Sequence, residues 1–472
     1  MKKMNENKKT FIALTIYVIC MSLFLLVTMR SESDYYWHIK AGEYMFNHGI
    51  LKKDVFSWYL YGKYWMSHEW LFEIILYSFK LVFGSAHLLV YGFVCMCSLQ
   101  FIMFLANKEG YLKNVNFSMI WITLSMILIV FMQGRPHLIS FNLLALTIWF
   151  LYDTYRNEDS KLIYFLPLIS IIWANVHGGS SNLTYIFCFI FLIVGLFNFN
   201  RPKIYMNRLS KKQMLKYSIV AIVCMLCVNI NIHGFKMFVY PYQNMMNKVM
   251  ISNIAEWLPT NLNYPGHWVY VLVVVFIFFV MIFSKKKISF IDLALFGISI
   301  VLGFKNIRFW GYTYIIMSFV IFNYVGKRKL DIGTNTILII VSVMLVAFFC
   351  LSTNNIHKQL NSGYLVKKDI EAIKKVKPKR LFNMYNYGGE LIYNDIPVFI
   401  DGRADLYSNY NYLDYLSISD LRVNYIDLIE KYDFDYLLVS NQYSIDTYLK
   451  NNSDYEQIYE NKEIILYKKI VN

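Results

Sequence analysis

Two acidic residues and a histidine stand directly after the first long apolar run of the chain, in the stretch SESDYYWHIK, residues 31–40. A carboxylate at such a place can serve as a general base that takes the proton of an attacking hydroxyl group. Asp34 is the principal catalytic candidate, Glu32 is the second, and His38 is a candidate for substrate binding. The alternative is structural, because Asp34, or equally Ser33, could cap the helix that the spacing of WHIKAGEYM predicts.

His68 and Glu69, in the motif HEWL, are the next residues that could bind a substrate. A zinc protease would need a second histidine four residues after the first, and the chain has Phe72 at that position. The pattern therefore does not predict a zinc protease, and both residues stay candidates for substrate binding.

Basic residues in two short polar motifs could stabilise a growing negative charge. Arg135 and His137 lie in QGRPH, and Lys305 and Arg308 lie in GFKNIR. The planar guanidinium group of arginine can bind two phosphate oxygens at once, and His137 could donate a hydrogen bond. A phosphate leaving group needs such donors as its charge develops. The alternative for both arginines is anchoring to lipid headgroups near helix ends.

The motif WANVHGG contains two further binding candidates, Asn175 and His177. Asn175 and Glu256 could bind a sugar or, together with Asp34, a divalent ion. We predict neither a metal nor another cofactor, because no clean ligand spacing appears, although a divalent cation is compatible with these residues.

Asp401 and Arg403 complete the set of substrate-binding candidates and lie in FIDGRADLY, after an apolar run typical of a strand. Functional side chains often project where a strand ends. An ion pair that holds the fold together explains the same two residues at least as well.

Long apolar runs separated by short polar loops place these motifs in a membrane protein. The chain has 472 residues, of which 57% are hydrophobic, and about 20 apolar residues span a bilayer as a helix. The pattern predicts an α-helical polytopic membrane protein with about eleven transmembrane helices. The expected spans are 11–29, 86–106, 115–132, 137–152, 162–176, 179–199, 214–232, 267–284, 288–303, 309–325 and 335–352. The segment 69–84 contains charged residues and is expected to be an amphipathic helix at the outer surface.

The formal net charge of +15 indicates orientation rather than a nucleic-acid partner. Short loops rich in Lys and Arg remain in the cytoplasm. The basic clusters lie at 1–9, 200–212, 285–287 and 326–329. We therefore expect a cytoplasmic N-terminus and an extracytoplasmic C-terminal part. The polar motifs at 30–68, 133–137, 176–180, 233–266 and 303–308 then share the outer face.

The last part of the chain, 353–472, is polar and contains no run long enough to span a membrane. It predicts a small extracytoplasmic α/β domain that follows a transmembrane domain, 1–352, with a large first outer loop at 30–85. The residue pattern predicts strands within 380–384, 397–403, 434–440 and 462–469, and helices within 362–376 and 416–432.

In combination, the motifs resemble GT-C-type membrane glycosyltransferases. The residues that carry the resemblance are D-x-x-W-H-x-x-x-G-E (34–43), D-x-F-S-W (54–58), G-x-x-W (62–65), H-E-W-L (68–71), G-R-P-H (134–137), W-A-N-x-H-G-G (173–179), N-I-H-G (231–234), N-I-R (306–308), Y-N-Y-G-G-E (385–390) and F-I-D-G-R-A-D-L-Y (399–407). The chain looks like a bacterial protein distantly similar to the protein-mannosyltransferase and lipid A aminoarabinose transferase groups.

This resemblance implies transfer of a sugar from a polyprenyl-phosphate donor to an acceptor hydroxyl group at the outer face of the bacterial plasma membrane. The process would be synthesis or modification of cell-envelope glycan, and the acceptor would be a glycan, a lipid or a protein. Many members of the family carry two adjacent acidic residues, whereas this chain has Glu32-Ser33-Asp34. Which of the two acids is catalytic therefore stays open.

Two other functions are compatible with the sequence. A transporter or flippase of lipid-linked glycan would require charged or broken helices at the middle of the membrane and repeated halves. Ionisable residues within the expected spans are few, and Asp292 lies near the end of one. A non-catalytic envelope assembly protein would use the C-terminal domain for binding.

Overall fold

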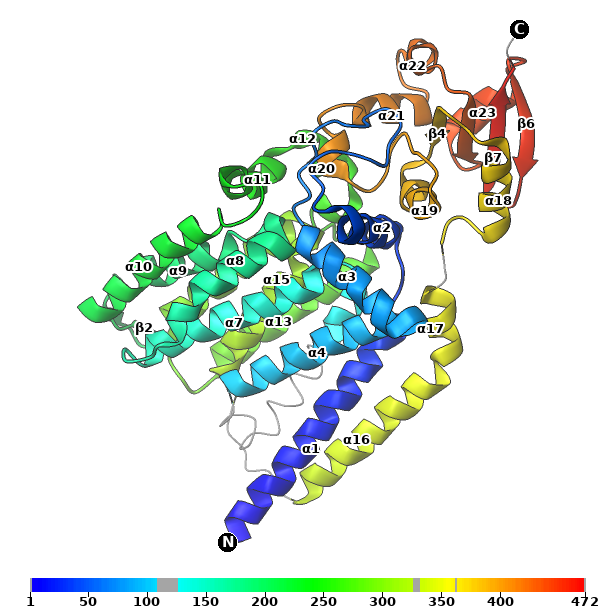
Figure 1. Cartoon of the computed structure of the whole chain (residues 1–472). Coiled ribbons are helices and arrows are strands. Elements are labelled where there is room, and N and C mark those ends of the chain that lie inside the picture. The colour runs from blue at the N-terminus through cyan, green and yellow to red at the C-terminus, as the bar shows by residue number, and fades with distance from the viewer. Residues whose placement is uncertain (1, 108–125, 326–331, 361–362, 471–472) are drawn as a thin grey trace. The chain divides into compact units, whose positions relative to one another are not determined.

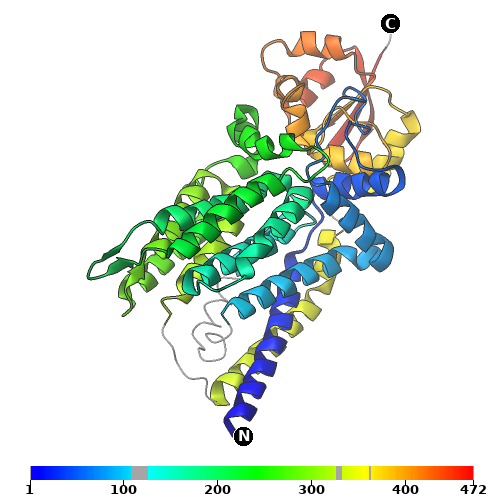
Figure 2. The ribbon, with the colours of Figure 1, turned by 60° about the vertical axis from the view of Figure 1, so that its left-hand side comes forward.

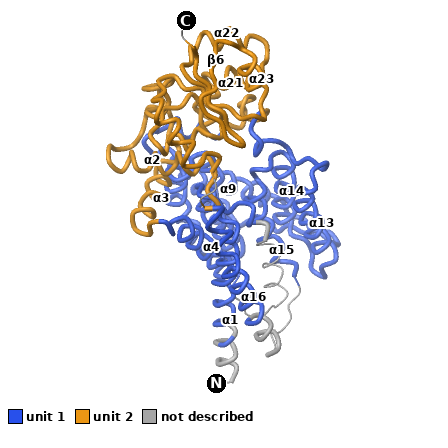
Figure 3. Tube along the Cα trace, turned by 90° about the vertical axis from the view of Figure 1, so that its right-hand side faces the viewer, with its two compact units in different colours: residues 1–29, 85–243, 253–359 blue, residues 30–84, 244–252, 360–472 orange. Residues whose placement is uncertain are grey.

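The computed structural model describes residues 2–107, 126–325, 332–360 and 363–470 (Figure 1). Most of the predicted span at 115–132, and all of the basic cluster at 326–329, lie outside these residues. The chain divides into two compact units, which Figure 3 distinguishes by colour. Unit 1 comprises residues 1–29, 85–243 and 253–359, and unit 2 comprises residues 30–84, 244–252 and 360–472.

Unit 1 is built mainly from helices, and a helix occurs at every expected span outside 108–125. They are α1 (Lys2–Leu25), α4 (His87–Ala106), α7 (His137–Arg156), α8 (Leu166–Val176), α9 (Leu183–Val194), α10 (Lys211–Cys227), α13 (Trp268–Phe283), α14 (Phe290–Lys305), α15 (Trp310–Phe322) and α16 (Ile332–Leu351). Two more helices, α11 (Phe235–Met246) and α17 (Thr353–Leu360), follow α10 and α16 in the chain.

Not all of these helices could cross a membrane by their own length and composition. Among the described residues, 4 helical segments could do so, at Phe11–Thr28, Trp70–Ala106, His137–Arg156 and Pro265–Phe283. The pair Ile339–Leu351 and Thr353–Leu360, bent by 54°, could form one more span. Shorter or less apolar helices occupy the other expected positions, so the count of eleven spans is not confirmed.

Helix α13 shows why unit 1 needs an apolar environment. Leu272 is 62% exposed and Phe283 is 77% exposed, and few side chains of this helix are buried. Exposing so much apolar surface to water is unfavourable. A contiguous apolar surface of this kind indicates contact with lipid or with another protein.

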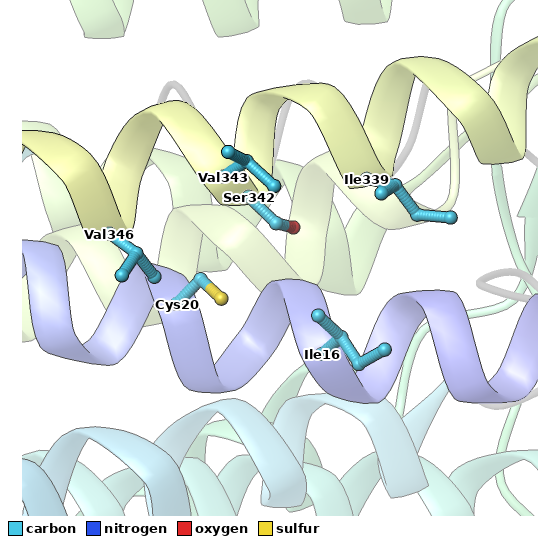
Figure 4. Close-up of a pocket in the computed structure, with 6 residues that line it drawn as sticks. All are labelled: Ile16, Cys20, Ile339, Ser342, Val343 and Val346. Atoms are coloured by element: carbon cyan, nitrogen blue, oxygen red, sulfur yellow. The ribbon is translucent and has the colours of Figure 1, made fainter.

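Helices α1 and α16 lie side by side (Figures 1 and 2). A groove of about 200 Å³ between them is lined by Ile16, Cys20, Ile339, Ser342, Val343 and Val346 (Figure 4). Its lining is almost entirely apolar. The groove therefore suits a hydrocarbon surface.

A small sheet joins two loops of unit 1 that carry basic clusters. It contains β1 (Phe199–Asn200), β2 (Ile204–Met206) and β3 (Ile288–Ser289), with β1 and β2 antiparallel and β2 and β3 parallel. Because β2 lies within the cluster at 200–212 and β3 directly follows the cluster at 285–287, these clusters belong to the same end of unit 1. Loops rich in Lys and Arg are expected on the same side of a membrane, and two such loops at one end of unit 1 agree with that expectation.

Unit 2 contains a four-stranded mixed sheet surrounded by helices. Its strands are β4 (Leu381–Asn383), β5 (Tyr436–Ser440), β6 (Tyr455–Glu460) and β7 (Ile464–Lys469), in the spatial order β4-β5-β7-β6. Only the β4–β5 pair is parallel. The helices are α2 (Ser33–His48), α3 (Trp70–Phe83), α12 (Lys248–Asn253), α18 (Lys367–Val376), α19 (Gly388–Tyr393), α20 (Ala404–Tyr407), α21 (Tyr412–Ser419), α22 (Tyr425–Tyr432) and α23 (Ser444–Lys450).

The sequence prediction for the C-terminal part needs two corrections. Residues 397–403 form no regular strand, because Val398 bridges Ser57 of the first loop instead of joining the sheet. The expected helix at 416–432 is broken into α21 and α22, since Leu421 and Asn424 have positive φ values of 54° and 71°. Strand β6 was not predicted, while β4, β5, β7 and α18 occur where strands and a helix were expected.

The core of unit 2 includes side chains from both ends of the sequence. Trp37 and Met45 of α2 belong to the same buried apolar cluster as Leu437 and Leu466 of the sheet. Trp58 also donates a hydrogen bond of 2.9 Å from Nε1 to the carbonyl oxygen of Leu381. Residues 30–84 therefore pack with 360–472, whereas the sequence analysis grouped them with the transmembrane domain, and the predicted boundary at 352/353 stays a prediction.

A fully buried guanidinium group ties these two parts together. Arg403 donates from Nη1 to Asp54 at 2.5 Å, and from Nε and Nη2 to Asp401 at 2.8 Å and 2.6 Å. Tyr407 donates its hydroxyl hydrogen to Asp401 at 2.5 Å, and the guanidinium carbon lies 4.8 Å from the ring centroid of Trp65. All three charged side chains are 0% exposed. Such charges tolerate burial only when they are paired and hydrogen-bonded.

Replacing Arg403 by Met should leave two buried carboxylates without their cation. Removing one partner of a buried ion pair costs about 3–5 kcal/mol, so we expect the free energy of unfolding of unit 2 to fall by about that amount. Urea unfolding of the full-length protein in detergent, followed by tryptophan fluorescence, measures this change.

The matched control is Arg422→Met. Arg422 pairs with Asp420 at 2.6 Å, but their side chains are 48% and 38% exposed, and an exposed pair contributes about 0–1 kcal/mol. Equal destabilisation by the two variants would contradict a special role for Arg403.

Candidate functional site

Asp34 lies in the first turn of α2, and it does not cap the helix. The N-cap residue is Glu32, which makes no side-chain capping bond, so the structural explanation of Asp34 as a cap is wrong. Asp34 instead accepts a hydrogen bond of 3.2 Å at Oδ1 from Nε1 of Trp37. The same oxygen lies against Gly402, where an added Cβ would come within 1.7 Å of it. Only glycine at 402 therefore allows this approach of the carboxylate.

Glu32, the second catalytic candidate, has a cationic partner next to it. Nη2 of Arg30 lies 2.9 Å from Oε1 of Glu32, and the two side chains are 49% and 23% exposed. This contact occupies one oxygen of the Glu32 carboxylate. Which of the two acids is catalytic stays open, and Asp34 remains the principal candidate.

His38, His68 and Glu69 lie in a chain of alternating imidazole and carboxylate groups. Nδ1 of His38 lies 3.2 Å from Glu73, and Nε2 of His38 lies 3.6 Å from Glu69. The other oxygen of Glu69 lies 3.0 Å from Nε2 of His68, whose Nδ1 is 3.8 Å from Asp405. Burial alone would lower the pKa of His68, but the carboxylates of Glu69 and Asp405 outweigh it and raise that pKa above its ordinary value.

Asp401 and Arg403 belong to the buried ion cluster described above. Their side chains are completely enclosed, so the structure favours the alternative in which they hold the fold together. Their position next to Gly402 nevertheless connects this cluster directly to Asp34.

In unit 1, two of the predicted basic residues meet at one carboxylate. Nη1 of Arg135 lies 3.1 Å from Oε2 of Glu256, and Nη1 of Arg308 lies 2.7 Å from Oε1 of the same residue. The three side chains are 20%, 31% and 36% exposed, in the order Arg135, Arg308, Glu256. This triad combines two positive charges with one negative charge at a place that water can reach.

Each member of the triad is positioned by a turn at a helix end. Arg135 precedes α7, Glu256 lies in a 3-10 turn at Ala255–Trp257, and Arg308 lies in one at Ile307–Phe309. Backbone bonds join the last two segments, because the N–H of Thr260 donates to Phe304 at 3.0 Å and the N–H of Ile307 donates to Leu258 at 3.1 Å.

His177 stands next to the triad and has a defined tautomer. Nη2 of Arg308 lies 3.5 Å from Nε2 of His177, and because a guanidinium group can only donate, Nε2 must accept. The proton of the neutral ring is then on Nδ1, which lies 2.7 Å from Oγ of Ser140. Tyr312 also approaches Nδ1, at 3.3 Å. The buried His177 thus fixes the direction of the Arg308 side chain.

The remaining predicted residues of unit 1 lie elsewhere or have other partners. His137 lies 2.6 Å from the carbonyl oxygen of Phe131 through Nε2. Asn175 donates from Nδ2 to two backbone carbonyl groups, of Ile171 at 2.8 Å and Ile230 at 2.9 Å. Lys305 is exposed, and its side chain forms no ion pair or hydrogen bond with the described residues. Its role as a phosphate ligand stays a prediction.

Some residues of these clusters were not predicted as site residues, because the sequence around them indicates little about their partners. Asp54 lies in the quoted motif D-x-F-S-W, but nothing in the sequence pairs it with Arg403. Glu73 interrupts the apolar helix WLFEIILY, which is the one visible sign that it has a buried partner. Ser140 and Tyr312 carry no local signal, because hydroxyl groups are common in apolar helices.

Glu390, in the motif Y-N-Y-G-G-E, is a buried carboxyl group with backbone partners. It accepts hydrogen bonds from the N–H groups of Tyr364 at 2.7 Å and Leu365 at 2.9 Å. Burial raises its pKa to about 7, although these two N–H donors oppose the shift. The group therefore titrates close to physiological pH.

Comparison with known proteins gives only distant matches. No family model and no curated protein matches the chain. The oligosaccharyltransferase of Archaeoglobus fulgidus tethered to an acceptor peptide with an NVT sequon is 12% identical, with 91% of this chain and 69% of that chain covered and a TM-score of 0.49. The same archaeal enzyme, AglB, in complex with an inhibitory peptide and a dolichol-phosphate is 11% identical, with 92% and 70% covered and a TM-score of 0.49. A TM-score below 0.5 does not establish a shared fold, so neither match assigns a function to this chain.

The raised pKa of Glu390 predicts a pH-dependent stability. The folded state holds a proton that the unfolded chain releases near pH 4.5, so the stabilisation is complete below that pH and is lost as pH rises through about 7. We expect a loss of about 3 kcal/mol in the free energy of unfolding across this window. Urea unfolding of the full-length protein at several pH values measures it.

Glu390→Gln should remove this pH dependence, because an amide does not ionise. Glu371→Gln is the control, since Glu371 is 63% exposed in its ion pair with Lys367. A wild-type stability that does not fall between pH 5 and pH 8, relative to Glu390→Gln, would contradict the assignment.

Proposed function

We propose that the chain is a GT-C-type membrane glycosyltransferase that moves a sugar from a polyprenyl-phosphate donor to an acceptor hydroxyl group at the outer face of the membrane. The observation that carries the proposal is the triad in unit 1, in which Arg135 and Arg308 both bind Glu256. The type of reaction, transfer of a sugar, is inferred from the motifs that resemble those of GT-C enzymes and from the carboxylate of Asp34.

The triad has the features of a phosphate site held by an internal carboxylate. Two guanidinium groups offer parallel N–H donors, the arrangement that phosphate oxygens prefer. Glu256 is about one third exposed, so an incoming anion can compete with it. The ring of Trp257, 5.2 Å from the guanidinium carbon of Arg308, and the acceptor nitrogen of His177 keep Arg308 in place.

The chemistry follows from these roles. The acceptor oxygen forms a bond with the anomeric carbon of the sugar, and its proton passes to the carboxylate of Asp34. The bond between the anomeric carbon and the phosphate oxygen breaks, and polyprenyl phosphate leaves with the electron pair. The negative charge that develops on that oxygen requires fixed cationic donors, and Arg135 and Arg308 of unit 1 are the candidates for this role.

Asp34→Asn should abolish most of the transfer, because an amide cannot accept the proton. General base catalysis contributes about 10²–10⁴ in rate, so we expect a fall of that size in kcat with little change in KM for the donor. The assay follows transfer from labelled polyprenyl-phosphate sugars by the full-length protein in membranes. Glu43→Gln, an exposed substitution on the same helix, is the control, and full activity of Asp34→Asn would remove Asp34 from the mechanism.

Arg308→Gln should weaken the binding of polyprenyl phosphate. A hydrogen bond to a charged group contributes about 1.5–3 kcal/mol, which corresponds to roughly 10-fold to 100-fold in Kd. A binding titration of the purified protein with polyprenyl phosphate measures the change. Arg156→Gln is the control, because Arg156 ends the helix that Arg135 precedes and donates to Asn323 at 2.7 Å.

The same preparations separate the proposed activity from its alternatives. Unchanged binding in Arg308→Gln would contradict a phosphate role for the triad. Movement of a lipid-linked sugar across liposome membranes without any sugar transfer would favour a flippase instead.

A further inference from the structure

Three potential metal ligands of unit 2 lie within one enclosed cluster. One nitrogen of His38 and one carboxylate oxygen each of Glu69 and Glu73 are all within 4.8 Å of one another. The residues are buried, with exposed fractions of 2%, 6% and 0%. This set combines one imidazole with two carboxylates, all of which bind divalent metal ions in proteins.

The two helices that carry these residues are built to bring them together. Glu69 directly precedes α3, and Glu73 lies in α3 one helical turn after Glu69. Both side chains therefore lie on the same side of that helix. His38 lies on α2, one turn before Gly42. A Cβ at Gly42 would come within 2.1 Å of the carbonyl oxygen of Glu73. The glycine therefore lets α2 approach α3 at the level of the cluster.

One carboxyl oxygen of the cluster has no hydrogen-bond partner in the described part of the chain. Both ring nitrogens of His38 face carboxylates, Nδ1 toward Glu73 at 3.2 Å and Nε2 toward Glu69 at 3.6 Å. A neutral imidazole has one N–H donor and one acceptor, so it can satisfy only one of them. Oε2 of Glu73 is buried and has no hydrogen-bond partner among the described residues. An unpaired carboxylate oxygen at such a place is costly, and a bound cation would complete its coordination.

The spacing of one ligand pair, His38 and Glu73, matches that around a metal ion of the zinc class. Ligands about 2.0–2.1 Å from a tetrahedral ion lie roughly 3.3 Å from one another, close to the 3.2 Å that separates Nδ1 of His38 from Glu73. The imidazole selects against Mg²⁺ and Ca²⁺, which prefer oxygen ligands alone. Zinc accepts nitrogen and carboxylate ligands together.

We propose that His38, Glu69 and Glu73 bind a divalent ion of the zinc class, which fastens α2 to α3. Asp34 precedes His38 by one turn of the same helix. The ion thereby fixes the helix that carries Asp34. Nε2 of His68 lies 3.0 Å from Glu69 and orients the carboxylate of that ligand. No metal was predicted from the sequence, because no clean ligand spacing appears in it.

The test uses the full-length protein in detergent, freed of any affinity tag and treated with a chelator. Calorimetric titration with Zn²⁺, together with the metal content after gel filtration, should give one ion per chain. Loss of a residue that only supports a metal ligand weakens binding by about 10-fold to 100-fold, so loss of a direct ligand in Glu73→Gln should weaken it by at least about 100-fold. The matched control is Glu43→Gln, which removes an exposed carboxylate from α2 and should bind Zn²⁺ like the wild type.

Two results would overturn the proposal. One is a chelated wild-type protein that takes up no Zn²⁺. The other is Zn²⁺ binding by Glu73→Gln equal to that of Glu43→Gln.

If Glu73→Gln fails to fold, X-ray absorption of the zinc-loaded wild type decides instead. It should show one imidazole nitrogen with oxygen ligands, and a shell containing sulfur or several imidazoles would refute the assignment. Neither measurement involves sugar transfer, so the outcome is independent of the proposed function.

Discussion

The burial of the Arg403 guanidinium group between Asp54 and Asp401 is the constraint on which unit 2 depends. Asp54 belongs to the loop between α2 and α3, and Asp401 belongs to the C-terminal part of the chain. Burying either carboxylate in this core without the cation would be costly, and so would burying the cation alone. Joining the two segments therefore satisfies all three charges at once. The same contact brings Gly402 against Asp34, so the ion cluster that holds the fold also positions the start of α2.

Two triads of similar composition have different physical roles in this protein. Arg403 with two aspartates is fully enclosed, and all three of its side-chain nitrogens donate hydrogen bonds. Glu256 with two arginines is partly exposed and carries a net positive charge. The first arrangement is suited to stability and the second to binding an anion, because water and ligands reach only the second. Exposure, rather than residue type, distinguishes a structural ion cluster from a candidate binding site.

Much of the candidate site could be read from the sequence because the residues are chemically distinctive and lie in short polar motifs between apolar helices. Arg135, His177 and Arg308 were selected on that ground, and they do come together in unit 1. The interpretation of Asp34 as a helix cap was wrong, since capping depends on the local turn, and the turn places Glu32 at that position. The expected strand at 397–403 was wrong for a related reason. Its apolar alternation is real, but its backbone partner lies in the first loop, which no local pattern reveals.

The sequence by itself determined where most of the helices and apolar runs lie and which residues can carry charge, because hydrophobicity and helical periodicity are local properties of the chain. Only the tertiary structure decided which of those charges are paired. His38 and Glu73, or Asp54 and Arg403, are remote in the chain and meet through the packing of α2, α3 and the C-terminal sheet. The energy of such a pair depends on the distance between its groups and on the water excluded around them, and both quantities exist only once the chain has folded.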